Sequence, residues 1–411
     1  MTRFFARRTL VLVLALACTT FATAQTERIL YEFGSTAGDG ENPMSGLISD
    51  PAGHLYGTAS YGGDNVNNWG TVFELTPQAS GWTEQLLHTF AGYYTDGSEP
   101  WGSLVRDAAG NLYGTTLNGG NSNFGSIFEL TPKAGGGWSE RVLLSFNGYP
   151  EGGANPKSGL ILDAAGNLYG TTTGGGTYPQ GTVFKLALQA GGLWKETILH
   201  SFTGTPSDGT DPEANLIFDG AGNLYGTTAS GGVYNYGTVF ELSPNASGTW
   251  TEKILHSFGG GSDGKNPSGS LIFDAAGNLY GTTSYGGANT FCGNVFELKR
   301  NAHGAWTETI LHTFEGYPTD GYASYASLTF DAAGNLYGTT YEGGSANSGT
   351  AFELVPGADG VWSEVVLHNF GLGTDGIGPV GGLTFGAGGR LYGTTSAGGA
   401  SNGGTVFEIT P

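Results

Sequence analysis

The sequence predicts an all-β fold, a seven-bladed β-propeller with four antiparallel strands in each blade. Three observations lead to this prediction: a ten-residue phrase recurs, tryptophan recurs at a fixed interval, and the two ends hold complementary parts of one repeat. The phrase DAAGNLYGTT starts at Asp107, Asp163, Asp274 and Asp331. The tryptophans are 56 residues apart, at Trp82, Trp138, Trp194, Trp250, Trp306 and Trp362. Such a period is typical of propellers and solenoids, in which one repeat is one supersecondary unit.

The repeat at residues 216–266 divides into four short strands. They are predicted at 216–219 (LIFD), 223–228 (NLYGTT), 238–243 (TVFELS) and 249–258 (TWTEKILHSF). Glycine, asparagine, aspartate and proline separate them, and no segment has the periodicity of a helix. Each repeat is therefore expected to be an antiparallel meander, with DAAGNLYG as the hairpin between its two innermost strands.

The recurring phrase is interpreted as a turn rather than as a metal or catalytic site. Its aspartate can accept hydrogen bonds from turn amides, its glycine supplies a positive φ, and its asparagine tolerates the same region. A calcium or catalytic aspartate would need further oxygen ligands at EF-hand-like spacing, and the sequence lacks them.

The outermost strand of each repeat carries a glutamate and a histidine. Trp250, Glu252, His256 and Phe258 share one face by the alternation of a strand. Glutamate follows every repeat tryptophan by two places, and histidine follows it by six places except at Leu144. Acid–base chemistry is one interpretation. Recurrence along the chain instead favours an architectural pair, whose members satisfy each other between neighbouring sheets.

The two ends of the chain indicate a closed ring. Residues 383–411 hold three strands of a repeat and then stop, whereas residues 26–33 (TERILYEF) match only the fourth. We predict that the N-terminal strand completes the C-terminal blade, with Ile29 near Phe407, which leaves only short protected edges. The predicted single domain spans residues 25–411. Its split blade comprises 26–46 and 383–411, and its complete repeats are 47–103, 104–159, 160–215, 216–270, 271–327 and 328–382.

The N-terminus resembles a secretory signal peptide. Residues 1–24 combine a basic start, an apolar run from Leu10 to Ala17 and a small-residue cleavage site. The apolar run is too short to span a bilayer and nothing later is apolar enough, so no transmembrane segment is expected. The protein is predicted to be secreted or periplasmic, with a lipoprotein anchored through Cys18 as the alternative.

Charge and cysteine content narrow the classes of partner. The chain has a formal net charge of −20, and three arginines and no acidic residues lie within the predicted signal. A surface this acidic repels nucleic acid, so no nucleic-acid partner is expected. Cys292 is the single cysteine beyond the signal, so packing rather than disulfide bonds must hold the fold together. We expect a monomer.

The repeated wording resembles a known tandem repeat. Written as DAAGNLYGTT…GG…GTVFEL…W.E..LHSF…DG..P, it is similar to the GloVer repeat of exported bacterial proteins described as choice-of-anchor. The resemblance covers essentially the whole chain after the signal and implies export without implying an activity. The D..GNLY part is also similar to β-propellers of the NHL and gluconolactonase-like type. The sequence ends at Pro411 with no sorting segment, so anchoring by that route is not expected.

The variable loops are the candidate ligand-binding surface. Loops between strands two and three and connections between blades are expected on one face, around the central opening, and loops on a rigid scaffold commonly carry binding. The candidate binding residues are the aromatics Trp69, Phe124, Tyr178, Tyr236 and Phe291 and the acids Asp96, Asp208, Asp263, Asp320 and Asp375. Five residues are singular but form no recognisable set: His54, Trp101, Arg106, Lys157 and His303.

Three function classes fit these features. A binding or scaffolding module would take a polysaccharide or a protein on the loop face, since rigid aromatics among Asn, Ser and Gly suit such a surface. The alternative is a hydrolase, lyase or lactonase with a site in the central opening, assisted by a divalent cation such as calcium on the aspartate ring. A purely structural surface protein is the third. No catalytic set is identified and no cofactor is expected. The sequence favours binding, because catalysis needs groups of differing pKa at one asymmetric place.

Overall fold

The computed structural model describes residues 26–63, 68–92, 94, 96–204, 206–259, 262–287, 292–358 and 360–411. The predicted signal peptide, Cys18 and the candidate binding residue Phe291 lie outside these ranges. None of the described residues belongs to a helix with the length and apolar character that crossing a bilayer requires.

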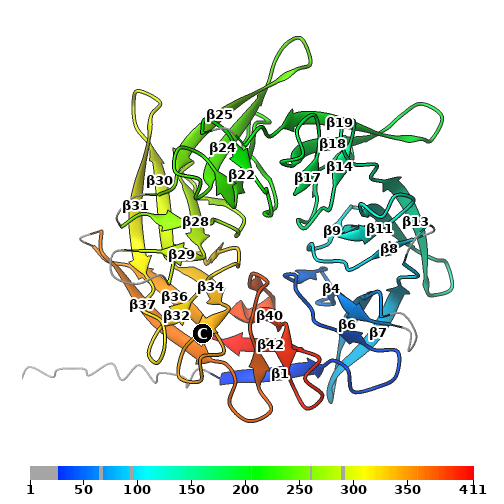
Figure 1. Cartoon of the computed structure of the whole chain (residues 1–411). Coiled ribbons are helices and arrows are strands. Elements are labelled where there is room, and N and C mark those ends of the chain that lie inside the picture. The colour runs from blue at the N-terminus through cyan, green and yellow to red at the C-terminus, as the bar shows by residue number, and fades with distance from the viewer. Residues whose placement is uncertain are drawn as a thin grey trace, which may run out of the picture.

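The described residues form seven four-stranded antiparallel sheets, arranged as blades around a central axis (Figure 1). Each blade is a meander whose innermost strand is short and whose outermost strand is long. The predicted seven-bladed, all-β propeller is confirmed.

The strands of each blade are given from the axis outward. Blade 1 contains β3 (Ile48–Ser49), β4 (Leu55–Ala59), β6 (Thr71–Gln78) and β7 (Gly81–Thr89). Blade 2 contains β9 (Val105–Arg106), β10 (Leu112–Thr116), β12 (Ser126–Pro132) and β13 (Trp138–Ser145). Blade 3 contains β15 (Ile161–Leu162), β16 (Leu168–Thr172), β18 (Thr182–Leu188) and β19 (Trp194–Ser201). Blade 4 contains β21 (Ile217–Phe218), β22 (Leu224–Thr228), β24 (Thr238–Pro244) and β25 (Trp250–Ser257). Blade 5 contains β27 (Ile272–Phe273), β28 (Leu279–Thr283), β30 (Asn294–Arg300) and β31 (Trp306–Thr313). Blade 6 contains β33 (Thr329–Phe330), β34 (Leu336–Thr340), β36 (Thr350–Pro356) and β37 (Trp362–Asn369). Blade 7 contains β39 (Thr384–Phe385), β40 (Leu391–Thr395), β42 (Thr405–Thr410) and β1 (Thr26–Glu32), with a 3₁₀ turn η1 (Ala387–Gly389) between β39 and β40.

A two-stranded ribbon accompanies each blade and joins a blade connection to the loop between strands two and three. The ribbon pairs are β2 (Gly40–Glu41) with β5 (Tyr61–Gly62), β8 (Gly97–Ser98) with β11 (Asn118–Gly119), β14 (Gly153–Ala154) with β17 (Gly174–Gly175), β20 (Gly209–Thr210) with β23 (Ser230–Gly231), β26 (Gly264–Lys265) with β29 (Tyr285–Gly286), β32 (Gly321–Tyr322) with β35 (Glu342–Gly343), and β38 (Gly376–Ile377) with β41 (Ala397–Gly398). The pairing confirms that these two sets of loops share one face, which we call the loop face.

Strand β1 closes the ring. It pairs antiparallel with β42, and Ile29 lies opposite Phe407 as predicted. In Figure 1 the blue strand β1 lies along the outer edge of the red C-terminal blade. The first and last strands of the ring therefore share one sheet, and the edge of β42 is covered.

The recurring phrase forms the predicted inner hairpin. In blade 5, Asp274 Oδ1 accepts hydrogen bonds from the amides of Ala276 and Asn278, at 2.8 and 2.9 Å. Its Oδ2 accepts from Asn278 Nδ2 at 2.8 Å and from the hydroxyl of Tyr280 at 3.3 Å. Burial alone would raise the pKa of Asp274, but these hydrogen bonds hold it below its ordinary value. The aspartate is thus a structural cap of the turn.

The cores lie between blades rather than within one. Phe258 of blade 4 is fully buried and packs edge-on against Phe296 of blade 5, with ring centroids 5.2 Å apart. The glycine of the second strand makes room for the third: a Cβ on Gly226 would lie 2.6 Å from Phe240 Cζ. Each repeat therefore completes its core only against its neighbour, as expected for stacked repeats.

Candidate binding pocket at the central opening

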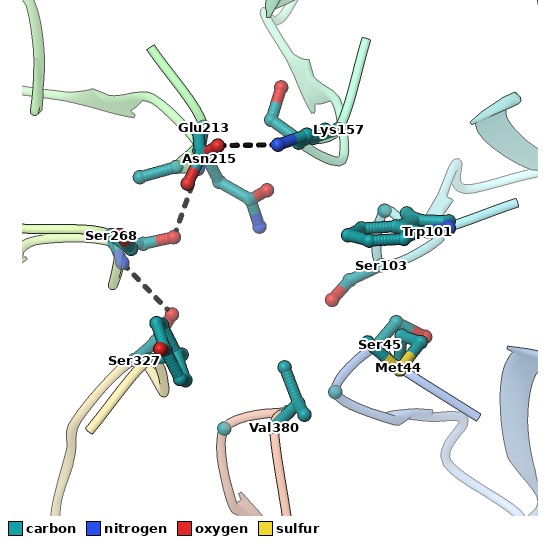
Figure 2. Close-up of a pocket in the computed structure, with 18 of the residues that line it drawn as sticks. Met44, Ser45, Trp101, Ser103, Lys157, Glu213, Asn215, Ser268, Ser327 and Val380 are labelled. Carbon is teal, nitrogen blue, oxygen red and sulfur yellow. Dashed lines mark hydrogen bonds and ion pairs between the residues drawn. The ribbon is translucent and has the colours of Figure 1, made fainter. Parts of the chain in front are cut away.

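A pocket of about 340 Å³ occupies the central opening (Figure 2). Apart from Tyr341, which follows β34, its lining comes from the short segments that precede the innermost strand of every blade, where each connection from the loop face reaches the axis. These segments carry small residues next to the strand, such as Ser45 and Gly46 in blade 1 and Gly381 and Gly382 in blade 7. Seven chain segments far apart in sequence thus converge on one cavity.

One repeat position dominates the wall of this pocket. Every repeat has a leucine at the start of its inner hairpin, and this position lies three residues before that leucine. Seven different residues occupy it. Those residues are Met44, Trp101, Lys157, Glu213, Ser268, Tyr325 and Val380, and all of them line the pocket. The inner hairpin that follows this position is largely shared between the repeats, whereas the loops of the loop face vary as well. Among the segments that reach the axis, the difference between blades is therefore greatest at this one position.

The charged and aromatic side of the pocket is formed by blades 2 to 4. Lys157 Nζ lies 2.5 Å from Glu213 Oε1. The same ammonium lies 5.7 Å from the ring centroid of Trp101, within cation–π distance. The indole, the ammonium and the carboxylate follow one another around the opening in Figure 2. The ion pair neutralises both charges and leaves the indole as the main flat surface on this side.

Hydrogen bonds between blades fix the rim. Asn215 Oδ1 accepts from the amide of Gly159 at 2.6 Å. Ser270 Oγ accepts from the amide of Asn215 at 3.0 Å, and Ser327 Oγ accepts from the amide of Ser270 at 3.2 Å. Each of these side chains holds the segment of the preceding blade, so the pocket wall is preorganised before any ligand arrives.

Comparison with known proteins identifies the family. The sequence profile of the Gloeobacter/Verrucomicrobia repeat matches residues 17–218, 136–352 and 293–411. The chain belongs to the Gloeobacter/Verrucomicrobia repeat family. This agrees with the resemblance drawn from the repeated phrase. No curated protein sequence matches the chain.

Several solved structures share the fold of this Gloeobacter/Verrucomicrobia repeat protein. One is assigned as a 6-phosphogluconolactonase from Bacteroides uniformis, with 16% identity, a TM-score of 0.53, and coverage of 85% of this chain and 89% of that one. PorZ, a surface component of the type-IX secretion system of Porphyromonas gingivalis, has 15% identity and a TM-score of 0.55, over 91% of this chain and 47% of PorZ. The extracellular domain of a B. thetaiotaomicron protein assigned as a hybrid two-component system has 12% identity and a TM-score of 0.56, over 93% and 39%. At such identities the likeness concerns the fold alone.

The predicted acids do not line the central pocket of this repeat protein. Asp208 is buried, and its Oδ1 and Oδ2 accept hydrogen bonds from the amides of Gly209 and Thr203, both at 2.7 Å. The same turn geometry is found at Asp96, Asp263, Asp320 and Asp375. The expectation of an aspartate ring around the opening therefore differs from the structure, because each carboxylate turns back into its own blade connection and toward the outer strand.

The predicted aromatics are spread over the loop face, one to a blade. Phe124 and Tyr236 cover glycines of the neighbouring connection, Gly148 and Gly259, at which an added Cβ would meet the ring at 2.9 and 2.5 Å. Trp69 covers Gly92 in the same way, and Tyr178 is half exposed. None of these four belongs to the pocket lining. Trp69, Phe124 and Tyr236 pack against the connections, and none of the four is gathered around the opening.

Two of the singular residues do come together. Trp101 and Lys157 lie side by side in the pocket, whereas His54, Arg106 and His303 are not among its lining residues. An alignment of the seven repeats shows that the position of Trp101 and Lys157 differs in every copy. The loop-face position of Trp69 differs in every copy as well, so sequence alone does not single out the pocket.

Proposed function

We propose that this protein is a binding module whose central pocket holds one sugar unit of a polysaccharide. The observation that carries the proposal is the pocket position at which seven otherwise similar repeats present seven different side chains. A repeat array that serves only as a scaffold has no need for such divergence at a single inward position. An asymmetric ligand requires it.

The chemistry of the wall fits a neutral carbohydrate. The half-buried indole of Trp101 offers a flat apolar face, and aromatic rings with a polar surround suit a ligand that is apolar on one side and hydroxylated on its edge. Ser103, Asn215 and Ser268 add hydroxyl and amide groups to the same lining. The volume of about 340 Å³ lies within the range of small-molecule sites. The paired charges of Lys157 and Glu213 favour a ligand without net charge.

The hydrolase, lyase or lactonase alternative receives less support. Acid–base or nucleophilic catalysis needs groups held at differing protonation states, or a nucleophile beside its base. The charged side chains among the pocket residues are Lys157 and Glu213, and they neutralise each other. The lining therefore offers groups for recognition more readily than groups for turnover.

A glycan array followed by calorimetry tests the proposal. We expect a neutral glycan to bind, and Trp101→Ala to weaken its binding by roughly tenfold or more, since loss of a stacking aromatic costs about 1.4 kcal/mol or more. Trp69→Ala is the matched control, because Trp69 lies on the loop face outside the pocket, and it should leave the affinity unchanged. Glycan binding that is insensitive to Trp101→Ala, or no binding across the array, would contradict the proposal.

We also infer that the ligand is met outside the cytoplasm. The support is the tripartite pattern of residues 1–24, which is typical of a secretory signal. Fractionation of cells that express the full sequence should find the protein outside the cytoplasm, shortened at its N-terminus. An uncleaved cytoplasmic product would contradict this inference.

A further inference from the structure

The blade interfaces hold a recurring cluster of possible metal ligands, away from the central pocket. A histidine of one outermost strand, the aspartate of the following connection and a glutamate of the next blade's outermost strand bring their ligand atoms within 4.8 Å of one another. In the part of the chain that the structure describes, the clusters are His200–Asp208–Glu252, His256–Asp263–Glu308, His312–Asp320–Glu364 and His368–Asp375–Glu27. The prediction that histidine and glutamate satisfy each other across sheets is corrected in part: in three clusters the glutamate lies 3.7–3.9 Å from the histidine, whose hydrogen-bond partner is the aspartate.

In two clusters the distances from the histidine to the carboxylates are close to those between the ligands of a small cation. His256 Nε2 lies 3.3 Å from Asp263 Oδ2 and 3.7 Å from Glu308 Oε1. The equivalent distances for His312 are 3.2 and 3.7 Å. Ligands about 2.1 Å from a tetrahedral zinc ion are about 3.4 Å from one another. The histidine-to-carboxylate distances of these two clusters are therefore within a few tenths of an ångström of that spacing.

One oxygen in each cluster has no other partner. The Oε1 atoms of Glu27, Glu252, Glu308 and Glu364 are shielded from solvent and make no hydrogen bond. Buried carboxylate oxygens are normally paired, and a cation shared with the imidazole would give these oxygens a partner. The Oε1 atoms of Glu84 and Glu140 are also unpaired, so it is the convergence of three ligand atoms that marks the four clusters. The other ligands are already oriented: the ring of His256 packs edge-on against Phe258 with centroids 4.6 Å apart, and Asp263 is held by the amides of Gly259 and Gly264.

The interface between blades 2 and 3 lacks both the histidine and the aspartate. At the positions of the histidine and the aspartate this interface has Leu144 and Gly152. Its glutamate remains, but Glu196 Oε1 there accepts a hydrogen bond from the amide of Gly153 at 3.2 Å. Both ligands are absent here, and the glutamate has a different partner; at the interface between blades 7 and 1 only the histidine is replaced, by Tyr31, whose hydroxyl donates to Asp39 Oδ2 at 3.1 Å. The interface between blades 2 and 3 also shows that two blades pack well without the cluster.

We propose that the four clusters are sites for a divalent transition-metal ion such as zinc, bound by one imidazole and two carboxylates with water in the fourth position. Imidazole favours zinc and its neighbours over calcium and magnesium, which prefer all-oxygen sites. Each ion links the outermost strands of two blades. The sites differ in place and in ligand type from a calcium ring at the axis, and they do not depend on the proposed sugar binding.

Titration of the metal-free full chain with zinc tests the proposal. Calorimetry should give four sites per chain, and zinc should raise the melting temperature relative to EDTA, because a ligand of the native state stabilises it by mass action. The double variant His256→Leu/Asp263→Gly copies the natural Leu144/Gly152 interface and should lose one site. Glu308→Gln alone should weaken that same site, and it keeps the variant series informative if the double variant is unstable.

Two controls separate these sites from adventitious zinc. His88→Leu/Asp96→Gly makes the same replacement at an interface where the three ligand atoms do not converge, so the number of sites should stay unchanged. His303→Asn removes an exposed histidine that belongs to none of the clusters and should also have no effect. Absence of zinc binding, or an equal loss of zinc in the control and test variants, overturns the proposal.

Discussion

Removal of strand β1 (Thr26–Glu32) and the residue after it tests ring closure through an effect that can be worked out from the structure. Phe33 is fully buried, with its ring centroid 4.9 Å from that of Phe73, and Leu30 is buried in the same cluster. Burial of each such side chain contributes about 1.5–3 kcal/mol. A chain that begins at Gly34 should therefore lose about 3–6 kcal/mol of unfolding free energy. For a domain of this size that loss lowers the melting temperature by about 4–7 °C.

Calorimetric melting of chains that begin at Thr26 and at Gly34 measures this loss. A synthetic peptide of residues 26–33 should bind the shortened chain and restore part of the melting temperature, whereas a peptide with the same residues in scrambled order should not. If the shortened chain melts like the longer one and ignores the peptide, the closure argument is wrong.

Three further predictions concern the repeats themselves. Gly226→Ala should destabilise the fold by about 1–3 kcal/mol, because its Cβ would lie 2.6 Å from Phe240 Cζ. Gly220→Ala is the control, because no atom lies within 4 Å of the added Cβ, and its free energy of unfolding should not change. Urea unfolding measures both variants. Asp274→Ala should lower the free energy of unfolding by about 1–3 kcal/mol, because it leaves turn amides unpaired. The difference between this variant and the parent should shrink at acid pH. A carboxyl with a lowered pKa loses its stabilising effect as the pH falls through that pKa. Burial raises the pKa of Glu84 from 4.5 to about 7, so its favourable protonated form is fully present below pH 4.5 and is lost as pH rises through 7. The shift corresponds to about 3 kcal/mol, which we halve to about 1.5 kcal/mol for solvent screening. Glu84→Gln should therefore stabilise the protein at pH 9 and not at pH 4; equal effects at both pH values would contradict the assignment.

The sequence was sufficient to predict the ring because local and global signals agree. The phrase around Asp274 fixes a turn through bonds to residues two to six places away, and such short-range chemistry can be read directly. The pairing of Ile29 with Phe407 could be predicted because two partial repeats add up to one. Neither the turn nor the strand pairing required knowing which way a side chain points.

The candidate site was harder to predict because it depends on where side chains point. Asp208 was expected at the axis, but its carboxylate turns toward His200 of the outer strand, which sequence distance alone does not reveal. Trp101 and Lys157 are 56 positions apart and meet only because successive blades bring equivalent positions side by side around the axis. The glutamate of each interface cluster comes from the next repeat, so its partners are equally hidden.

The seven residues at the axis are separate from the apolar cores that hold the blades together. None of Met44, Trp101, Lys157, Glu213, Ser268, Tyr325 and Val380 belongs to the buried clusters between blades. Replacement at one of them changes what the opening presents while the interlocking phenylalanines stay in place. The architecture thus separates the proposed recognition from folding, so that single substitutions at these seven positions can alter the pocket while the packing between blades is unchanged.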